Sequence, residues 1–237
     1  WYPEGIGRIV LNDKTRLVVL NSPHNPTGSI IDSSLAEQIL QLVEQYQCYL
    51  LSDDVSQASN YHDLALAHRY LDYPKSIVVG VMSKSLGLAG VRIGWAVTTD
   101  RGLLNSLLAI KAMNSICCSK IDERLACIAL QHSDEIIATN NAIIRKNIAL
   151  FSNFINRYKQ AFSWHPPQAG MLALVEVKNI DSMIAWSNTL VKATGILTLP
   201  SELFGLHGNY FRLGLGQSSF AQILVIFERY IKEQINN

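Results

Sequence analysis

The stretch Ser76–Gly94, SIVVGVMSKSLGLAGVRIG, carries the pattern from which we predict both the fold and the site. Its apolar first part, Ser76–Met82, predicts a buried strand of a parallel sheet. Lys84 follows in a glycine-rich loop, and Arg92 comes eight residues later. An isolated lysine is nearly always a solvated surface charge. Beside a buried strand, however, we expect Lys84 to be partly desolvated, which favours its neutral, nucleophilic form. Arg92 is suited to a bidentate contact with phosphate.

Similar apolar runs elsewhere indicate the remaining strands of this sheet. Arg16–Asn21 and Cys48–Asp53 predict two strands, and Val91–Val97 predicts a fourth. The capping-box pair Ser34 and Glu37, followed by helical periodicity, places a helix between the first two. Strands that alternate with helices predict an α/β fold with a mostly parallel sheet.

Three polar or charged residues lie at or just after the carboxyl ends of predicted strands: Asn25, Asp53 and Lys84. Alone, Asp53 would be interpreted as a helix cap or turn carboxylate, and Asn25, in the sequence NPTG, as a turn residue. Ligands of parallel sheets bind at the carboxyl ends of the strands. The convergence of the three residues therefore indicates a ligand site.

A helical pattern over Asp134–Lys159 exceeds the usual length of a globular helix and predicts a link between two domains. We place them at residues 1–145, a larger domain, and 146–237, a smaller α+β domain. For the second we expect strands over Met171–Val177, Ile196–Leu199 and Tyr210–Leu215. We expect helices over Asp181–Ala193, with Gly195 as the C-terminal stop, and over Gln217–Lys232.

Arg212 lies within one of these predicted strands, among apolar neighbours. A buried arginine needs an anionic partner, and no acidic residue is close to it in the sequence. This favours a substrate carboxylate as its partner over a salt bridge with a distant Asp or Glu.

Composition narrows the class of protein. Of 237 residues, 49% are hydrophobic and 16% charged, with a net charge of +1, which indicates a globular chain and no nucleic-acid or anionic-membrane partner. No apolar run is long enough to span a membrane. Four cysteines and six histidines show no metal-site spacing, so we expect no metal site. Reduced core thiols in a cytoplasmic protein are the favoured interpretation of the cysteines.

The motifs Pro23–Gly28, Asp53–Asp54, Ser83–Lys84, Gly90 with Arg92, and Arg212 occur in an order that resembles the class I/II aminotransferases, the fold-type-I pyridoxal-phosphate-dependent enzymes. The resemblance implies a three-layer αβα large domain like that of aspartate aminotransferase, with a mostly parallel sheet, and a smaller C-terminal domain. The family's N-terminal part has no counterpart here, so we expect the isolated chain to be a fragment with little or no activity.

The resemblance also implies roles for individual residues. Lys84 would form the Schiff base with pyridoxal 5'-phosphate and shuttle the proton at the substrate α-carbon. Asp53 would pair with the pyridine nitrogen, and Asn25 would bond the phenolic oxygen. The phosphate would be bound by Ser83 and Arg92.

Arg212 would bind the α-carboxylate of the substrate. The implied activity is amino-group transfer between an amino acid and a 2-oxo acid by a homodimer. Two positions depart from the family's usual pattern: Ser56 stands where a tyrosine is common, and Val81 where a hydroxyl residue is common. A lyase, decarboxylase or cyclase on the same fold, a ligand-sensing domain of a transcription regulator, and a degenerate remnant remain as alternatives.

Overall fold

The computed structural model describes residues 11–64 and 70–236 and divides into two compact units. Unit 1 contains the described residues up to His24, Ser29–Asn140 and Gln168–Gly170. Unit 2 contains Asn25–Gly28, Asn141–Pro167 and the chain from Met171 onward. The domains predicted from the sequence, 1–145 and 146–237, stay a prediction.

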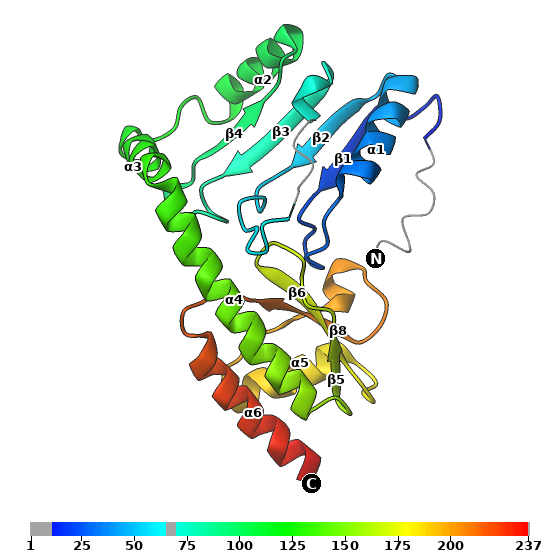
Figure 1. Cartoon of the computed structure of the whole chain (residues 1–237), viewed down its shortest axis with the longest axis vertical. Helices are drawn as coiled ribbons and strands as arrows, with labels where there is room; N and C mark the ends of the chain where they lie inside the picture. The colour runs from blue at the N-terminus through cyan, green and yellow to red at the C-terminus, as the bar shows by residue number, and fades with distance from the viewer. Residues whose placement is uncertain (1–10, 65–69, 237) are drawn as a thin grey trace. The chain divides into compact units, whose positions relative to one another are not determined.

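Unit 1 is built on a four-stranded sheet in the order β1 (Leu17–Asn21), β2 (Tyr49–Asp53), β3 (Ser76–Val81) and β4 (Gly94–Val97), as Figure 1 shows. The first three strands are parallel, and β4 runs antiparallel to β3. The predicted mixed α/β fold with a mostly parallel sheet is therefore confirmed. A three-layer arrangement stays a prediction.

Helix α1 (Ser33–Gln45) covers the β1–β2 part of this sheet (Figure 1). The predicted capping box is wrong: the cap is Asp32, whose Oδ1 accepts a hydrogen bond from Leu35 N at 2.8 Å, so Ser34 already lies in the first turn. The aspartate competes successfully because a carboxylate is at least as good an N-cap as a serine hydroxyl. The buried face of α1 joins a core formed with β2 and the short helix η2 (Tyr70–Asp72), comprising Ala36, Ile39, Val43, Leu50, Tyr70 and Tyr73.

The other helices of unit 1 follow β3 and β4. They are η3 (Ala89–Val91), α2 (Arg101–Asn114) and α3 (Lys120–Gln131), and the last two were not predicted from the sequence. A second core packs α3 against the loop after β3 and consists of Met82, Leu86, Val91, Ala126 and Ala129. By contrast, α2 buries no residue and all four residues of β4 are exposed.

Helix α4 (Ser133–Arg157) contributes residues to both units, since the division falls between Asn140 and Asn141. In unit 2 an antiparallel sheet has the order β5 (Phe162–Trp164), β6 (Leu172–Val177), β8 (Tyr210–Gly214) and β7 (Leu199–Pro200).

Strand β7 is shorter and later than the predicted Ile196–Leu199. One reason is local: Ile196 N donates to Thr194 Oγ1 at 3.1 Å, which takes that amide away from strand pairing. Helix α5 (Met183–Thr194) ends at Gly195 with φ +75°, as predicted, because glycine adopts this left-handed conformation without a Cβ penalty. A short helix, η4 (Ser201–Phe204), follows β7.

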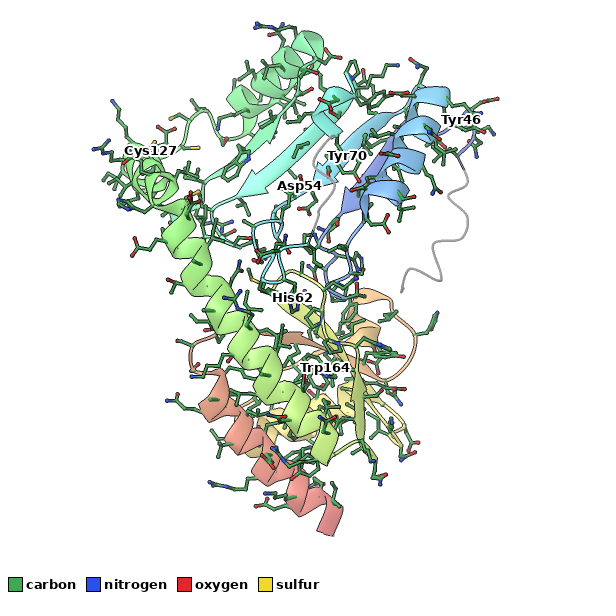
Figure 2. The ribbon with its side chains drawn as sticks, in the orientation of Figure 1. Tyr46, Asp54, His62, Tyr70, Cys127 and Trp164 are labelled. Carbon is green, nitrogen blue, oxygen red and sulfur yellow. The ribbon has the colours of Figure 1, made fainter. Side chains whose placement is uncertain are left out.

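The core of unit 2 is aromatic. Helix α6 (Phe220–Asn236) packs alongside α4, and rings from both helices meet rings from the sheet and α5. Trp164 of β5, labelled in Figure 2, is half-buried, and its ring contacts Phe151 at a centroid distance of 4.9 Å. The aromatic rings that contact one another in this core are those of Phe151, Phe154, Phe162, Trp186, Phe211 and Phe227.

Candidate active site

The loop between β3 and β4 carries three of the predicted site residues, Ser83, Lys84 and Arg92. Because β4 is antiparallel to β3, Gly94 pairs with Val81, and Met82 N donates to Ile93 O at 3.0 Å. The loop therefore leaves the carboxyl end of β3 and returns to the same edge of the sheet. This topology places Arg92 at the same edge as Lys84, although eight residues separate them.

The side chain of Lys84 is exposed in the described structure, and that of Ser83 is half-buried. The expected desolvation of Lys84 is therefore wrong for this chain. The physical reason is its position: Lys84 lies past the strand in a turn closed by a hydrogen bond from Gly87 N to Lys84 O at 2.8 Å. The apolar run that precedes it buries Met82, not the lysine.

Arg92 is held in an unusual backbone conformation. Its φ is +53° and ψ +33°, in the left-handed region, and its Nη1 donates to Ala89 O at 3.0 Å. A non-glycine residue in this region costs on the order of 1 kcal/mol, and such strain gathers at functional sites. The guanidinium is exposed, so donors remain for an anion.

Asp53 is the last residue of β2 and lies in register with Asn21 of β1 and Val79 of β3. It is half-buried, and its Oδ1 accepts a hydrogen bond from Val55 N at 3.2 Å. The parallel register thus brings the carboxylate to the edge from which the Lys84 loop departs.

The neighbouring Asp54 has different surroundings, near Tyr70 (Figure 2). Its Oδ1 accepts a hydrogen bond from Ser52 Oγ at 2.5 Å. Burial, together with the negative charge of Asp54, raises the pKa of Tyr70 to about 12. These contacts support a structural role for Asp54.

Asn25 and Arg212 meet in unit 2, although 187 positions separate them in the sequence. Arg212 Nη1 donates to Asn25 Oδ1 at 3.4 Å. Arg212 is half-buried rather than buried, between Leu174 and Leu199 in the sheet register. Within residues 11–64 and 70–236, no carboxylate forms an ion pair with Arg212.

Sequence reasoning missed the residues that surround the Lys84 turn. Ser59 and Ser85 form a buried pair with 2.9 Å between their hydroxyl oxygens, and Asn140 Nδ2 donates to Ser85 O at 2.9 Å. The one available signal was that Ser85 follows Lys84 directly. The partners lie 26 and 55 positions away and have no sequence pattern in common.

The described part of the chain gives no support to a metal site, since no group of three His, Cys, Asp or Glu residues is placed to hold an ion. All four cysteines are free, but only Cys48 is a core residue. The prediction of core thiols is wrong for Cys117, Cys118 and Cys127, which lie at or near the surface because they fall on α3 or on the segment before it. None of the described helices has the length and apolarity needed to cross a bilayer.

Solved structures share this architecture. A PLP-dependent aminotransferase from Streptococcus suis matches with a TM-score of 0.86 and 25% identity, over 94% of this chain and 59% of that one. The PLP-dependent cyclase OrfR matches with a TM-score of 0.84 and 26% identity, over 93% of this chain and 59% of that one. The chain has an aspartate aminotransferase-like fold.

Curated relatives agree with the structures. Capreomycidine synthase of Streptomyces vinaceus is 30% identical over 198 residues, which is 84% of this chain and 51% of the relative. Histidinol-phosphate aminotransferase of Methanococcus aeolicus is 28% identical over 206 residues, 87% of this chain and 53% of the relative. The chain spans about half the length of these relatives. Residues 6–226 match the family described as aminotransferase class I and II, and the chain belongs to that family.

Proposed function

We propose that the protein is a pyridoxal-phosphate-dependent aminotransferase that moves an amino group between an amino acid and a 2-oxo acid. The observation that carries the proposal is the single sheet edge to which the structure brings Asp53 and the Lys84–Arg92 loop. Membership of the aminotransferase class I and II family supports it.

The residues of this edge fit the chemical groups of pyridoxal phosphate. Lys84 offers a primary amine for an aldehyde, and its side chain is accessible. Ser83 and the exposed guanidinium of Arg92 offer donors for a phosphate. Asp53 offers a carboxylate for a protonated ring nitrogen. When bound, the cofactor supplies an electron sink for negative charge on the substrate α-carbon.

The chain's own residues then have distinct tasks. Lys84 Nζ would accept and return the proton at the substrate α-carbon, acting as general base and then general acid. Asp53 would keep the ring nitrogen protonated through its negative charge. Arg92 would orient the phosphate with a rigid, bidentate fork.

In unit 2, Arg212 would bind the substrate α-carboxylate. Its uncompensated charge within the described residues supports this role. The contact with Asn25 Oδ1 leaves the other guanidinium donors for a carboxylate, and it restricts the arginine rotamer. Asn25 would bond the phenolic oxygen of the cofactor through its amide nitrogen.

Ser56, where the family commonly has a tyrosine, is half-buried and lies near Gly170, where an added Cβ would be 4.0 Å from Ser56 Cβ. A serine reaches less far than a tyrosine, so we propose that the phenolic oxygen receives its bond from Asn25 alone. Val81, the other departure, ends β3 and pairs with Gly94. It leaves Ser83 as the hydroxyl donor for the phosphate.

We also propose a cytoplasmic homodimer. The exposed apolar residues of α2 and α3 support a partner surface on unit 1, among them Met113 and Ile121. The free cysteines are consistent with a reducing compartment. Analytical ultracentrifugation of the full-length protein would test the dimer.

A cyclase is the second candidate, favoured by two findings: the 30% identity with capreomycidine synthase and the TM-score of 0.84 with the cyclase OrfR. Fold similarity does not decide the reaction. Product analysis separates the two, because transamination converts the cofactor to its amine form and yields a 2-oxo acid, whereas cyclisation returns the aldehyde form.

The first experiment is visible absorbance of the full-length protein with pyridoxal phosphate, for wild type and for Lys84→Ala. We expect a visible band that Lys84→Ala abolishes and that an amino acid bleaches. Lys120→Ala is the matched control, since Lys120 is also an exposed lysine of unit 1. A lysine-dependent band that no amino acid bleaches would favour the cyclase, and a folded protein without any band would refute both.

A further inference from the structure

Backbone hydrogen bonds define the turn that carries Lys84. Gly87 N donates to Lys84 O at 2.8 Å, and Leu88 N donates to Met82 O at 2.9 Å. Within the two described ranges, Lys84 Nζ has no hydrogen bond or ion pair. The backbone of the turn therefore fixes the Cα–Cβ bond from which the lysine side chain extends, and whatever holds that backbone sets where the amine can reach.

A buried pair of hydroxyls holds the residue next to the lysine. Ser59 is 1% exposed and Ser85 5% exposed, and their Oγ atoms are 2.9 Å apart. Because neither hydroxyl is open to water, breaking this bond would leave an unpaired polar group in the interior. The pair thus resists any displacement of Ser85, and with it of Lys84.

Each of the two serines also accepts a hydrogen bond, through its backbone oxygen, from a residue at which the chain leaves unit 1. Asn140 Nδ2 donates to Ser85 O at 2.9 Å, and Asn140 is the last residue of unit 1 on helix α4. Gly170 N donates to Ser59 O at 2.8 Å, and Gly170 is the last residue of the returning segment Gln168–Gly170. Both exits are thus hydrogen-bonded to the two serines that hold the lysine turn.

Two glycines permit this arrangement. Gly87 has φ +71°, and a Cβ there would lie 3.3 Å from Asn140 Nδ2. Gly170 has φ +79°, and a Cβ there would lie 3.3 Å from Pro23 Cβ. Both positions need a left-handed backbone next to a close neighbour, so a side chain at Gly87 would press on Asn140 and one at Gly170 would press on Pro23.

We propose that Ser59, Ser85 and Asn140 are positioning residues for Lys84. They act on the lysine through the backbone of its turn, and they touch neither cofactor nor substrate. The inference rests on the proposed function, because it concerns the reactivity of the amine toward pyridoxal phosphate. The alternative is that the network only stabilises unit 1 and leaves Lys84 unaffected.

The test measures the reactivity of the Lys84 amine directly, without turnover. Full-length protein is mixed with pyridoxal phosphate and trapped with borohydride. The amine condenses with the aldehyde and releases water, and hydride reduces the resulting C=N bond to a secondary amine. Peptide mass spectrometry then gives the trapping rate at Lys84 and at Lys120, as a function of pH.

We expect Ser59→Ala and Ser85→Ala to lower the trapping rate at Lys84 about fivefold, the factor equivalent to one net hydrogen bond. Asn140→Asp, which replaces the amide donor by a carboxylate oxygen of the same shape, should act in the same direction. Ser76→Ala is the matched control. Ser76 is a fully buried serine of unit 1 whose hydroxyl has no partner among the described residues. In the Ser76→Ala variant, the trapping rate at Lys84 should equal that of wild type.

The double variant Ser59→Ala/Ser85→Ala separates positioning from stability. Each single variant leaves one buried hydroxyl unpaired, whereas the double variant leaves none, so its unfolding midpoint should recover toward wild type. The proposal requires the trapping rate at Lys84 to stay low in the double variant. It is overturned if trapping recovers together with stability, or if the single variants trap as wild type does. If wild-type Lys84 traps no faster than Lys120, the proposed function fails first.

Discussion

Units 1 and 2 bury their apolar side chains to different extents. In unit 2 the rings of α4, α5, α6 and the sheet enclose one another, and Phe154 is 0% exposed. In unit 1 the side around α1 is closed, but β4, α2 and α3 leave large apolar side chains in contact with solvent, such as Met113, which is 87% exposed. Unit 2 therefore has a closed aromatic core, although it also exposes apolar side chains outside that core, such as Leu197 at 83%. In unit 1 the exposed apolar side chains gather on β4, α2 and α3.

The two units also contribute different residues to the predicted site. Four of the predicted site residues, Asp53, Ser83, Lys84 and Arg92, lie in unit 1, and two, Asn25 and Arg212, lie in unit 2. The less enclosed unit thus supplies the groups that suit a cofactor. The well-packed unit supplies a pair fixed by one hydrogen bond.

The largest expected effect is in the aromatic core. Phe154→Ala removes a ring that contacts Phe162 and Phe227, and we expect it to lower the free energy of unfolding by about 3–5 kcal/mol. Met113→Ala, on the exposed side of unit 1, should change it by less than about 0.5 kcal/mol. Urea unfolding of both variants measures the contrast. Equal losses of unfolding free energy in the two variants would contradict the difference in packing between the units.

An effect of intermediate size on stability is expected for Tyr70, in the core of unit 1 that α1 covers. Tyr70 is buried, and its hydroxyl has no hydrogen-bond partner among the described residues. Tyr70→Phe removes that unpaired group, so stability at neutral pH should be unchanged or rise by up to about 1 kcal/mol. A loss of stability at neutral pH would show that the hydroxyl is paired after all.

The same substitution has a pH dependence with a defined sign. Burial raises the pKa of Tyr70 from 10.0 to about 12, so above pH 10 the unfolded chain loses this proton before the folded one does. Stability of the wild type should therefore fall as pH rises through that window, and Tyr70→Phe should lose less. Unfolding curves at several alkaline pH values, compared with those of Ser76→Ala, measure the difference.

The smallest effect concerns an ion pair on the surface of unit 2. Arg157 Nη2 lies 2.9 Å from Glu228 Oε2, and Tyr158 Oη donates to Glu228 Oε1 at 3.0 Å. Burial acts to raise the pKa of Glu228, but the bonds from Arg157 and Tyr158 outweigh it and hold that pKa below 4.5. The carboxylate therefore stabilises the fold above pH 4.5, and this contribution is lost as pH falls through the lowered pKa.

Because Arg157 is half-exposed, solvent screens the pair. Glu228→Gln should cost less than about 1 kcal/mol at neutral pH and nothing in strong acid. Chemical unfolding at both pH values checks this. A loss of unfolding free energy near that of Phe154→Ala would mean that the aromatic core does not dominate the stability of unit 2.

The order of elements was readable from local patterns. The strands at Arg16–Asn21, Cys48–Asp53 and Ser76–Met82 are β1, β2 and β3 to within one residue at each end, because continuous apolar runs between turn residues indicate strands. The predicted burial is wrong for β1, whose Leu17 and Val19 are exposed, and for β3, of which only Ser76 is buried. Helices α2 and α3 were missed. Helix α2 buries nothing and shows little of the apolar periodicity by which helices are predicted, and the residues that α3 buries are two alanines, Ala126 and Ala129.

The sequence by itself determined the candidate groups: a lysine, an arginine and a carboxylate at the ends of apolar runs, in an order that resembles the aminotransferases. Chain connectivity and apolar periodicity suffice for that. Only the tertiary structure decided that Lys84 is exposed, that Arg92 has a left-handed backbone, and that Arg212 meets Asn25. The hydrogen bond between Ser59 and Ser85 was likewise decided only by the tertiary structure. Such contacts join residues far apart in the chain, and their geometry depends on how whole strands and helices pack.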